Sequence, residues 1–191
     1  MSELEPAESG VRGRTRLAIL TAAMTVLADN PAATLADIAA AAQVGRTTIH
    51  RYYPERADLI RALALHVHAL SNAAIEEADP THGPALDALR RVVEIQLNLG
   101  PIVQYVFTEP TIIGDPGLAA HLDTGDETIV EVLERVSTQP ASAPPGWARR
   151  VFWALVGAGH EAVKADGAPK HQIVDAIMTS LTEGTINPNR A

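Results

Sequence analysis

The sequence predicts an all-α protein, and three observations support this prediction. Hydrophobic residues make up 47% of the 191 residues but aromatic residues only 4%, so alanine and aliphatic side chains must fill most of the core. Alanine and leucine have the most favourable intrinsic helix propensities. Apolar residues recur at helical spacing along the chain, and no segment shows the alternation that is typical of a strand.

The first three predicted helices are short and closely spaced. The first carries one apolar stripe and ends at Asp29-Asn30-Pro31; the stripe is Ile19, Leu20, Ala23, Met24 and Leu27. Thr34 is the expected N-cap of the second helix, because the acidic Asp37 follows three residues later. After a tight turn at 43–45, a third helix is predicted from Arg46 to Tyr53. Pro54 ends it, because a proline disfavours the α conformation in the residue before it.

Longer helices are expected in the rest of the chain. Their predicted ranges are 56–78, 84–99, 101–108, 117–138, 146–165 and 170–183. Two proline-containing segments, 110–116 and 140–146, are expected to be loops, and the acidic residues 1–9 are expected to be disordered. No internal repeat is present.

The third helix has an outward face suited to reading DNA. If Ile49 points inward, Tyr53 does so too, since it lies one turn later. The outward residues are then Arg46, Thr47, Thr48, His50 and Arg51. Arginine pairs with guanine, and threonine offers a hydroxyl group and a methyl group to base edges. The alternative is an ordinary polar face on a short helix; the turn length, the inward pair and the proline stop weigh against it.

Charge is distributed unevenly along the chain. The net charge of −8 argues, taken alone, against a nucleic-acid partner. Residues 10–61, however, carry seven arginines and four acids, whereas residues 62–191 carry eight basic and sixteen acidic residues. This distribution indicates one surface that faces phosphate and a remainder that repels it.

Three segments, 16–23, 34–44 and 46–59, resemble the tetracycline-repressor (TetR) family of regulators. The likeness covers about fifty residues, and the remaining two-thirds match the family only in length and helical layout. The resemblance implies a helix-turn-helix DNA-binding domain at 10–54 and a helical ligand-binding and dimerisation domain at 55–191. It also implies a repressor that binds a palindromic operator as a homodimer and is released by a small-molecule effector.

Position by position, the resemblance implies base reading by Arg46, Thr47, His50 and Arg51. It implies phosphate contacts by Thr34, Thr48, Tyr52 and Arg56. The chain departs from the family at Gln43, where a small residue is usual and φ > 0 is expected, at Gly45, where serine is common, and at His50, where tyrosine is usual. Two alternatives stay open for Arg12, Arg14 and Arg16: a clamp on the flanking DNA backbone, or a solvated arm.

The body of the chain offers one candidate ligand site and one candidate dimer interface. The site is the group Gln104, Tyr105, Phe107 and Trp153, which places scarce aromatic and polar groups in an apolar setting; ordinary core packing is the alternative for each aromatic residue. A hydrophobic, neutral or cationic effector is expected. The dimer is expected to form through the last two helices, with one stripe at Ala154, Gly157, Ala158 and Ala162 and another at Ile173, Ile177 and Leu181. Packing against the protein's own core is the alternative for both stripes.

Several classes of site are disfavoured. The chain has no cysteine, and His66 and His68 diverge by about 200° on a helix, so neither a metal site nor a cofactor is expected. No secretory signal or membrane-spanning segment is recognised, so a cytoplasmic protein is expected. The rival functions are a small helical enzyme, for which no nucleophile motif, phosphate loop or paired carboxylates are found, and a helical adaptor that does not bind DNA.

Overall fold

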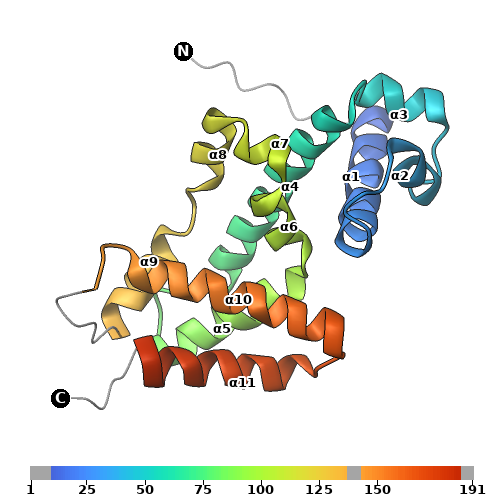
Figure 1. Ribbon diagram of the computed structural model, residues 1–191. Coiled ribbons are helices and arrows are strands. Elements are labelled where there is room, and N and C mark those ends of the chain that lie inside the picture. Colours follow the sequence, from blue (N-terminus) through green and yellow to red (C-terminus); the bar gives the residue numbers. More distant parts are fainter. Residues whose placement is uncertain (1–9, 137–142, 186–191) are drawn as a thin grey trace.

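The computed structural model describes residues 10–136 and 143–185, and every regular element within those ranges is a helix (Figure 1). The predicted all-α class is therefore confirmed. The acidic residues 1–9 and the first part of the 140–146 segment lie outside the described residues. None of the described helices is long and apolar enough to cross a membrane.

The first three helices form a small group that we call the reading head. They are α1 (Val11–Asp29), α2 (Leu35–Ala41) and α3 (Arg46–Tyr52). The predicted cap of α2 is confirmed: the Thr34 hydroxyl accepts a hydrogen bond from the Asp37 amide, and the Asp37 carboxylate accepts one from the Thr34 amide. The short helices pack on one another through fully buried apolar side chains, namely Ile19, Leu27, Ile38 and Ile49.

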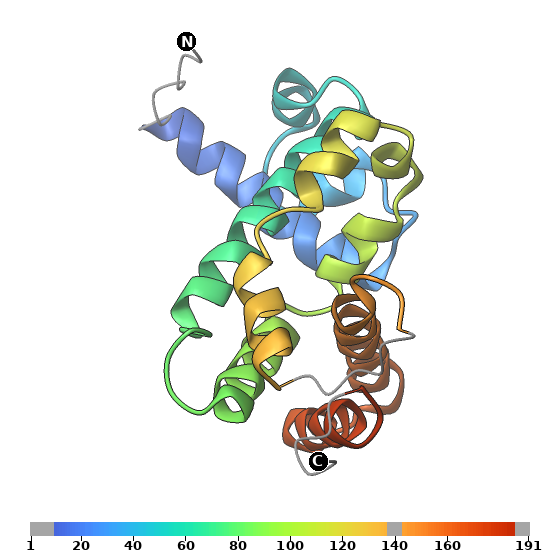
Figure 2. The same cartoon turned by 90° about the vertical axis from the view of Figure 1, so that its left-hand side faces the viewer.

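The long helix α4 (Arg56–Glu77) leads from the reading head into the body. The body also contains α5 (Ala85–Leu99), α6 (Ile102–Thr108), α7 (Pro110–Ile113), α8 (Pro116–Leu122), α9 (Glu127–Val136), α10 (Trp147–Asp166) and α11 (Lys170–Ser180), and a π-helical turn, Leu181–Thr185, follows α11. Figures 1 and 2 both show α10 and α11 side by side, and Figure 1 shows that they run in opposite directions.

The buried side chains form two apolar clusters. The first joins all three helices of the reading head to α4, α6, α7 and α8. The second lies between α5, α9, α10 and α11 and reaches the end of α4. The first cluster continues across residue 54, so the reading head shares its core with the body.

Two expected elements differ in the structure. The helix expected at 117–138 is divided into α8 and α9, because Gly125 between them has a φ of 91°. A Cβ atom on Gly125 would lie 2.2 Å from the Asn72 side chain, so any larger residue would strain the backbone and displace Asn72. The loop expected at 110–116 contains the short helix α7, which begins at Pro110, a residue favoured at a first helical position.

Candidate DNA-reading face and ligand cavity

The outward face of α3 is solvent-exposed. Ile49 is 0% exposed and Tyr53 3%, so both point inward as expected. Arg46, Thr47, His50 and Arg51 are exposed, and Thr48 is half-buried. The turn before α3 has the left-handed residue expected there, since Gln43 has a φ of 55°. A row of hydrogen-bonding side chains is therefore presented on one face of a short helix.

Several of the expected DNA contacts already make hydrogen bonds within the chain. The Tyr52 hydroxyl donates to the Arg12 carbonyl at 3.2 Å, and the Arg51 guanidinium lies 5.6 Å from the centre of the Tyr52 ring. The Thr34 hydroxyl donates to the Asp37 carboxylate at 2.7 Å. Hydrogen bonds from Thr34 hold the pKa of Asp37 below its ordinary value. To donate to a phosphate, the hydroxyl groups of Tyr52 and Thr34 would have to exchange these partners.

Arg56 points between the reading head and the body rather than into solvent alone. Its guanidinium donates to the carbonyls of Pro31 at 2.8 Å and Ala33 at 3.2 Å, both in the connection between α1 and α2. It also donates to the Tyr105 hydroxyl at 3.1 Å and lies 3.4 Å from the Glu109 carboxylate. Four groups of the chain itself therefore bond to the guanidinium, and the phosphate contact of Arg56 that the resemblance implied remains a prediction.

Tyr105 lies on the side of α6 that faces Arg56. Burial raises the pKa of Tyr105 to about 12, and a hydrogen bond to Glu109 adds to the effect, so the hydroxyl stays protonated at neutral pH. A second basic side chain reaches the reading head from α10, because Lys164 Nζ donates to the Ala28 carbonyl near the end of α1. The reading head is thus held to both α6 and α10 through backbone carbonyls.

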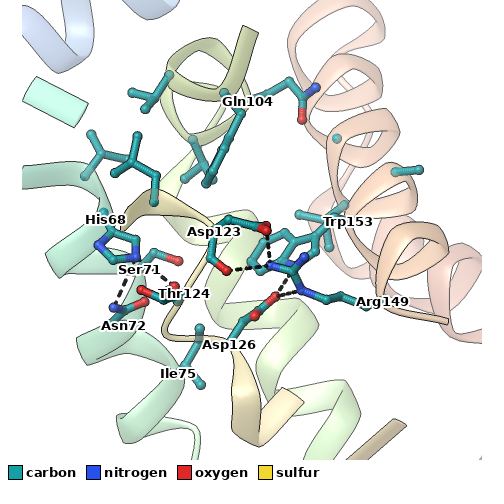
Figure 3. Close-up of a pocket in the computed structure, with 18 of the residues that line it drawn as sticks. His68, Ser71, Asn72, Ile75, Gln104, Asp123, Thr124, Asp126, Arg149 and Trp153 are labelled. Carbon is teal, nitrogen blue, oxygen red and sulfur yellow. Dashed lines mark hydrogen bonds and ion pairs between the residues drawn. The ribbon is translucent and has the colours of Figure 1, made fainter. Parts of the chain in front are cut away.

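A cavity of about 340 Å³ lies in the body between α4, α6, the α8–α9 connection and α10 (Figure 3). Three residues of the expected ligand site line it: Gln104, Phe107 and Trp153. Tyr105 does not line it, and this corrects the expected site. The reason is helical geometry, since Tyr105 is about 160° around α6 from Val103 and Phe107, which do line the cavity.

One wall of the cavity is polar and tightly bonded. Asp126 is 6% exposed, and its carboxylate accepts hydrogen bonds from Arg149 at 2.7 Å and from the Trp153 indole at 2.6 Å. Arg149 also pairs with Asp123 at 2.9 Å, so its guanidinium lies between the two carboxylates, as Figure 3 shows. The hydrogen bond to Asp126 raises the pKa of Arg149 above its ordinary value. Arg149 thus offsets one of the two carboxylate charges of this wall.

A histidine fixes the other side of the same wall. His68 Nε2 donates to the Thr124 carbonyl at 2.8 Å, and the His68 ring packs edge-on against His121. Sequence reasoning missed His68, Asp126, Arg149 and His160 as cavity residues. A usable signal existed for α10, since Arg149, Trp153, Gly157 and His160 follow one another at three- or four-residue spacing on one helical stripe.

The structure assigns part of the expected dimer stripes to the protein's own core. Gly157 is buried, and a Cβ atom there would lie 2.7 Å from Gln104 Oε1. Ile177 and Leu181 are also buried within the second apolar cluster. Ala154 and Ala158 on α10 remain exposed. Within residues 10–136 and 143–185, no group of three or more histidines and acids is placed to hold a metal ion.

Comparisons with known proteins agree with this geometry. The family model of bacterial regulatory proteins, tetR family, matches residues 19–63. The HTH-type transcriptional repressor LfrR of Mycolicibacterium smegmatis is 72% identical over 179 residues, which cover 94% of each chain. The HTH-type transcriptional regulator NfxB of Pseudomonas aeruginosa is 33% identical over 79 residues, 41% of this chain and 42% of its own.

Solved structures give the same result. The crystal structure of LfrR from Mycobacterium smegmatis in complex with proflavine has 71% sequence identity and a TM-score of 0.83, and the match covers 91% of this chain and 98% of that one. The regulator PfmR of Thermus thermophilus shares the fold at 17% identity, with a TM-score of 0.66 and coverage of 87% and 97%.

Proposed function

This chain belongs to the tetR family of bacterial regulatory proteins, and from that premise we propose that it is a repressor which binds operator DNA and releases it when a small molecule fills the cavity. The family is one of regulators rather than enzymes, which disfavours the enzymatic alternative. The observation that carries the proposal is the exposed, arginine-containing face of α3. In this scheme residues 10–54 read DNA, and residues 55–191 bind the effector and form the dimer.

In the proposed complex, α3 enters the major groove of the operator. Arg46, Thr47, His50 and Arg51 read base edges, because they are exposed on the outer face of that helix. Thr34, Thr48 and Tyr52 contact phosphates at the rim of the groove. Their contribution positions the protein but carries little sequence information.

We place the homodimer interface on the outer faces of α10 and α11. Ala158 is exposed on α10 and Ala176 on α11, and Ala154, which also lines the cavity, is exposed as well; such small side chains allow two helices to approach closely. The buried residues Gly157, Ile177 and Leu181 support these helices from within. A two-fold axis at this interface would present two α3 helices to a palindromic operator.

We infer that the effector is a flat aromatic cation. The related LfrR has been crystallised with proflavine, which is a fused three-ring cation. In this chain the cavity combines the rings of Phe107 and Trp153 with the carboxylates of Asp123 and Asp126. Ligand cavities of this kind are mainly apolar, with a few polar groups that fix orientation.

The same helices that line the cavity also hold the reading head, which supplies a route for the response. On α6, Gln104 and Phe107 line the cavity while Tyr105 bonds to Arg56. On α10, Trp153 lines the cavity while Lys164 bonds to Ala28. A ligand that displaces α6 or α10 would therefore move the α1–α2 connection, and hence α3. The ligand can shift the equilibrium between the DNA-binding and the released conformation only by the difference between its affinities for the two.

The test is a titration of DNA binding. Operator sequences are selected from random DNA, and binding is followed by fluorescence anisotropy for the wild type, for Arg46→Ala and for the control Ile113→Ala on α7. We expect tight, salt-dependent binding that Arg46→Ala alone weakens and that proflavine reverses. Failure of the wild type to select any sequence would contradict the proposed function, whereas selection without release by proflavine would contradict only the proposed effector class.

A further inference from the structure

A short chain of buried polar groups borders the cavity. Ser71 is 7% exposed, Gln96 0% and His160 3%. The Ser71 hydroxyl donates to Gln96 Oε1 at 3.1 Å, and Gln96 Nε2 donates to the Ser71 carbonyl at 3.4 Å. His160 Nε2 lies 3.1 Å from the backbone carbonyl of Gln96. Ser71 and His160 line the cavity, and Gln96 lies behind them.

The hydrogen bond to Gln96 fixes the form of the His160 ring. A carbonyl oxygen can only accept, so His160 Nε2 carries the hydrogen. Burial is the main effect and lowers the pKa of His160, and the positive charge of Lys170 lowers it further. The hydrogen bond to the Gln96 carbonyl and the charge of Glu161 raise the pKa, but by less. The ring is therefore neutral at pH 7. In this tautomer Nδ1 has a lone pair and no hydrogen.

That lone pair has no partner in the protein. Nδ1 of His160 is fully buried and forms no hydrogen bond with any of the described residues. Buried polar atoms without partners are rare in folded proteins, and each calls for an explanation. The side chain that carries this atom forms part of the cavity wall, but Nδ1 itself has almost no accessible surface, so an effector reaches it only when a neighbouring side chain moves.

We propose that His160 Nδ1 accepts a hydrogen bond from an amino substituent of the effector, and that it thereby selects aromatic amines with an N–H on that substituent over analogues whose amino groups are fully alkylated. This inference rests on the proposed function, because it names a recognition element within the same cavity. His160 follows Arg149 by eleven residues on α10, about 16 Å along the helix axis. An elongated aromatic molecule lying along α10 would thus have the Asp126 wall near one end and His160 near the other.

Two dyes test the inference, since proflavine carries two NH₂ groups and acridine orange carries two N(CH₃)₂ groups on the same cationic ring system. Binding of each is measured by calorimetry to the full-length wild type, to His160→Leu and to His160→Asn. Leucine removes the acceptor, whereas asparagine can place its oxygen close to the position of Nδ1. We expect the wild type to prefer proflavine, His160→Leu to bind proflavine about tenfold more weakly with acridine orange little changed, and His160→Asn to keep most of the preference.

The outcomes separate the two claims. Equal binding of both dyes by the wild type, or a preference for proflavine that survives in His160→Leu, would overturn the inference and leave the effector class intact. If neither dye binds, the proposed effector class fails and the inference fails with it. If His160→Leu does not fold, a ¹⁵N NMR spectrum of the wild type gives a second measurement. The His160 Nδ1 signal should shift towards that of a hydrogen-bonded acceptor when proflavine is added, but not when acridine orange is added. A signal that does not move with proflavine would overturn the inference.

Discussion

Arg56 Nη1 lies 3.4 Å from Glu109 Oε1, so the first residue of α4 is joined to the residue that follows α6, 53 positions later in the chain. The Glu109 side chain is only 12% exposed, which reduces the screening of this pair by solvent. Through the same guanidinium, the carbonyls of Pro31 and Ala33 are linked to α6. The contact therefore joins a cavity-lining helix to the connection that precedes α2.

Arg56→Ala should weaken the response to the effector, while the salt dependence of DNA affinity changes little. Loss of the link between α6 and the reading head should raise the effector concentration needed for release, by a factor within the range of about 5 to 150 that is typical of such coupling. The dependence of DNA affinity on salt should stay close to that of the wild type. A slope shallower by about 0.9 per half-site would instead indicate a lost phosphate contact.

Arg51→Ala should relax operator specificity. An arginine paired with guanine contributes about 1–3 kcal/mol of discrimination, so one position per half-site should become degenerate in sequences selected from random DNA. Arg61→Ala on α4 is the matched control, since Arg61 is also an exposed arginine but pairs with Asp58 and Asp115. Identical selection profiles for Arg51→Ala and wild type would remove Arg51 from the reading face.

Phe107→Ala should abolish or strongly weaken release by proflavine while operator affinity stays near that of the wild type. Phe107 lies on α6 and lines the cavity in the body, whereas the α3 face belongs to the reading head. The control is Ile113→Ala, which removes another exposed apolar side chain on nearby α7 that does not line the main cavity. Dose–response curves for release would show whether the two variants differ; matching curves would place the effector elsewhere.

Thr34→Ala should destabilise the protein by about 0.5–2 kcal/mol, because it removes the cap of α2. Thr34→Ser keeps the hydroxyl and should be close to the wild type in the free energy of unfolding measured with urea. Both variants should be compared at saturating DNA as well. If Thr34→Ala is as stable as the wild type, the hydroxyl does not stabilise the protein by capping α2. Normal DNA binding by Thr34→Ser would then show only that a hydroxyl group is present.

The free energy of unfolding should decrease as the pH falls below about 6.5. The pKa of His160 is lowered in the folded protein, so in this range the unfolded chain binds a proton that the folded chain does not. Each such group contributes at most about 1.4 kcal/mol per pH unit between its folded and unfolded pKa values. His160→Asn should show a shallower slope between pH 5 and 6.5, as measured by urea unfolding. Some slope should remain, because burial also lowers the pKa of His66.

The reading head could be predicted in detail because its signals are local. The cap at Thr34, the turn at Gln43 and the stop at Pro54 each involve residues within a few positions of one another. Helical periodicity then sufficed to place Ile49 inward and Arg51 outward. Such short-range rules do not depend on how the remaining helices pack.

The cavity was predicted only in part because it depends on tertiary arrangement. Tyr105 and Phe107 are two residues apart, and composition gave no means of deciding which of them faces the cavity and which faces Arg56. The polar wall arises from the break at Gly125, which brings Asp126 to Arg149 on α10. That break could not be seen in the apolar pattern, since the residues on either side of it continue a helical repeat.

The apolar cluster that crosses residue 54 has a consequence for engineering chimaeric regulators. Exchange of residues 1–54 between relatives is attractive as a way to combine one operator specificity with another effector response. Here the graft would bring foreign side chains against Leu63, Val103 and Val106, which pack in the same cluster as α1. Volume mismatches of this kind typically destabilise a core by about 1–3 kcal/mol. A functional hybrid should therefore transfer the apolar residues of α4 and α6 that face α1 together with the head.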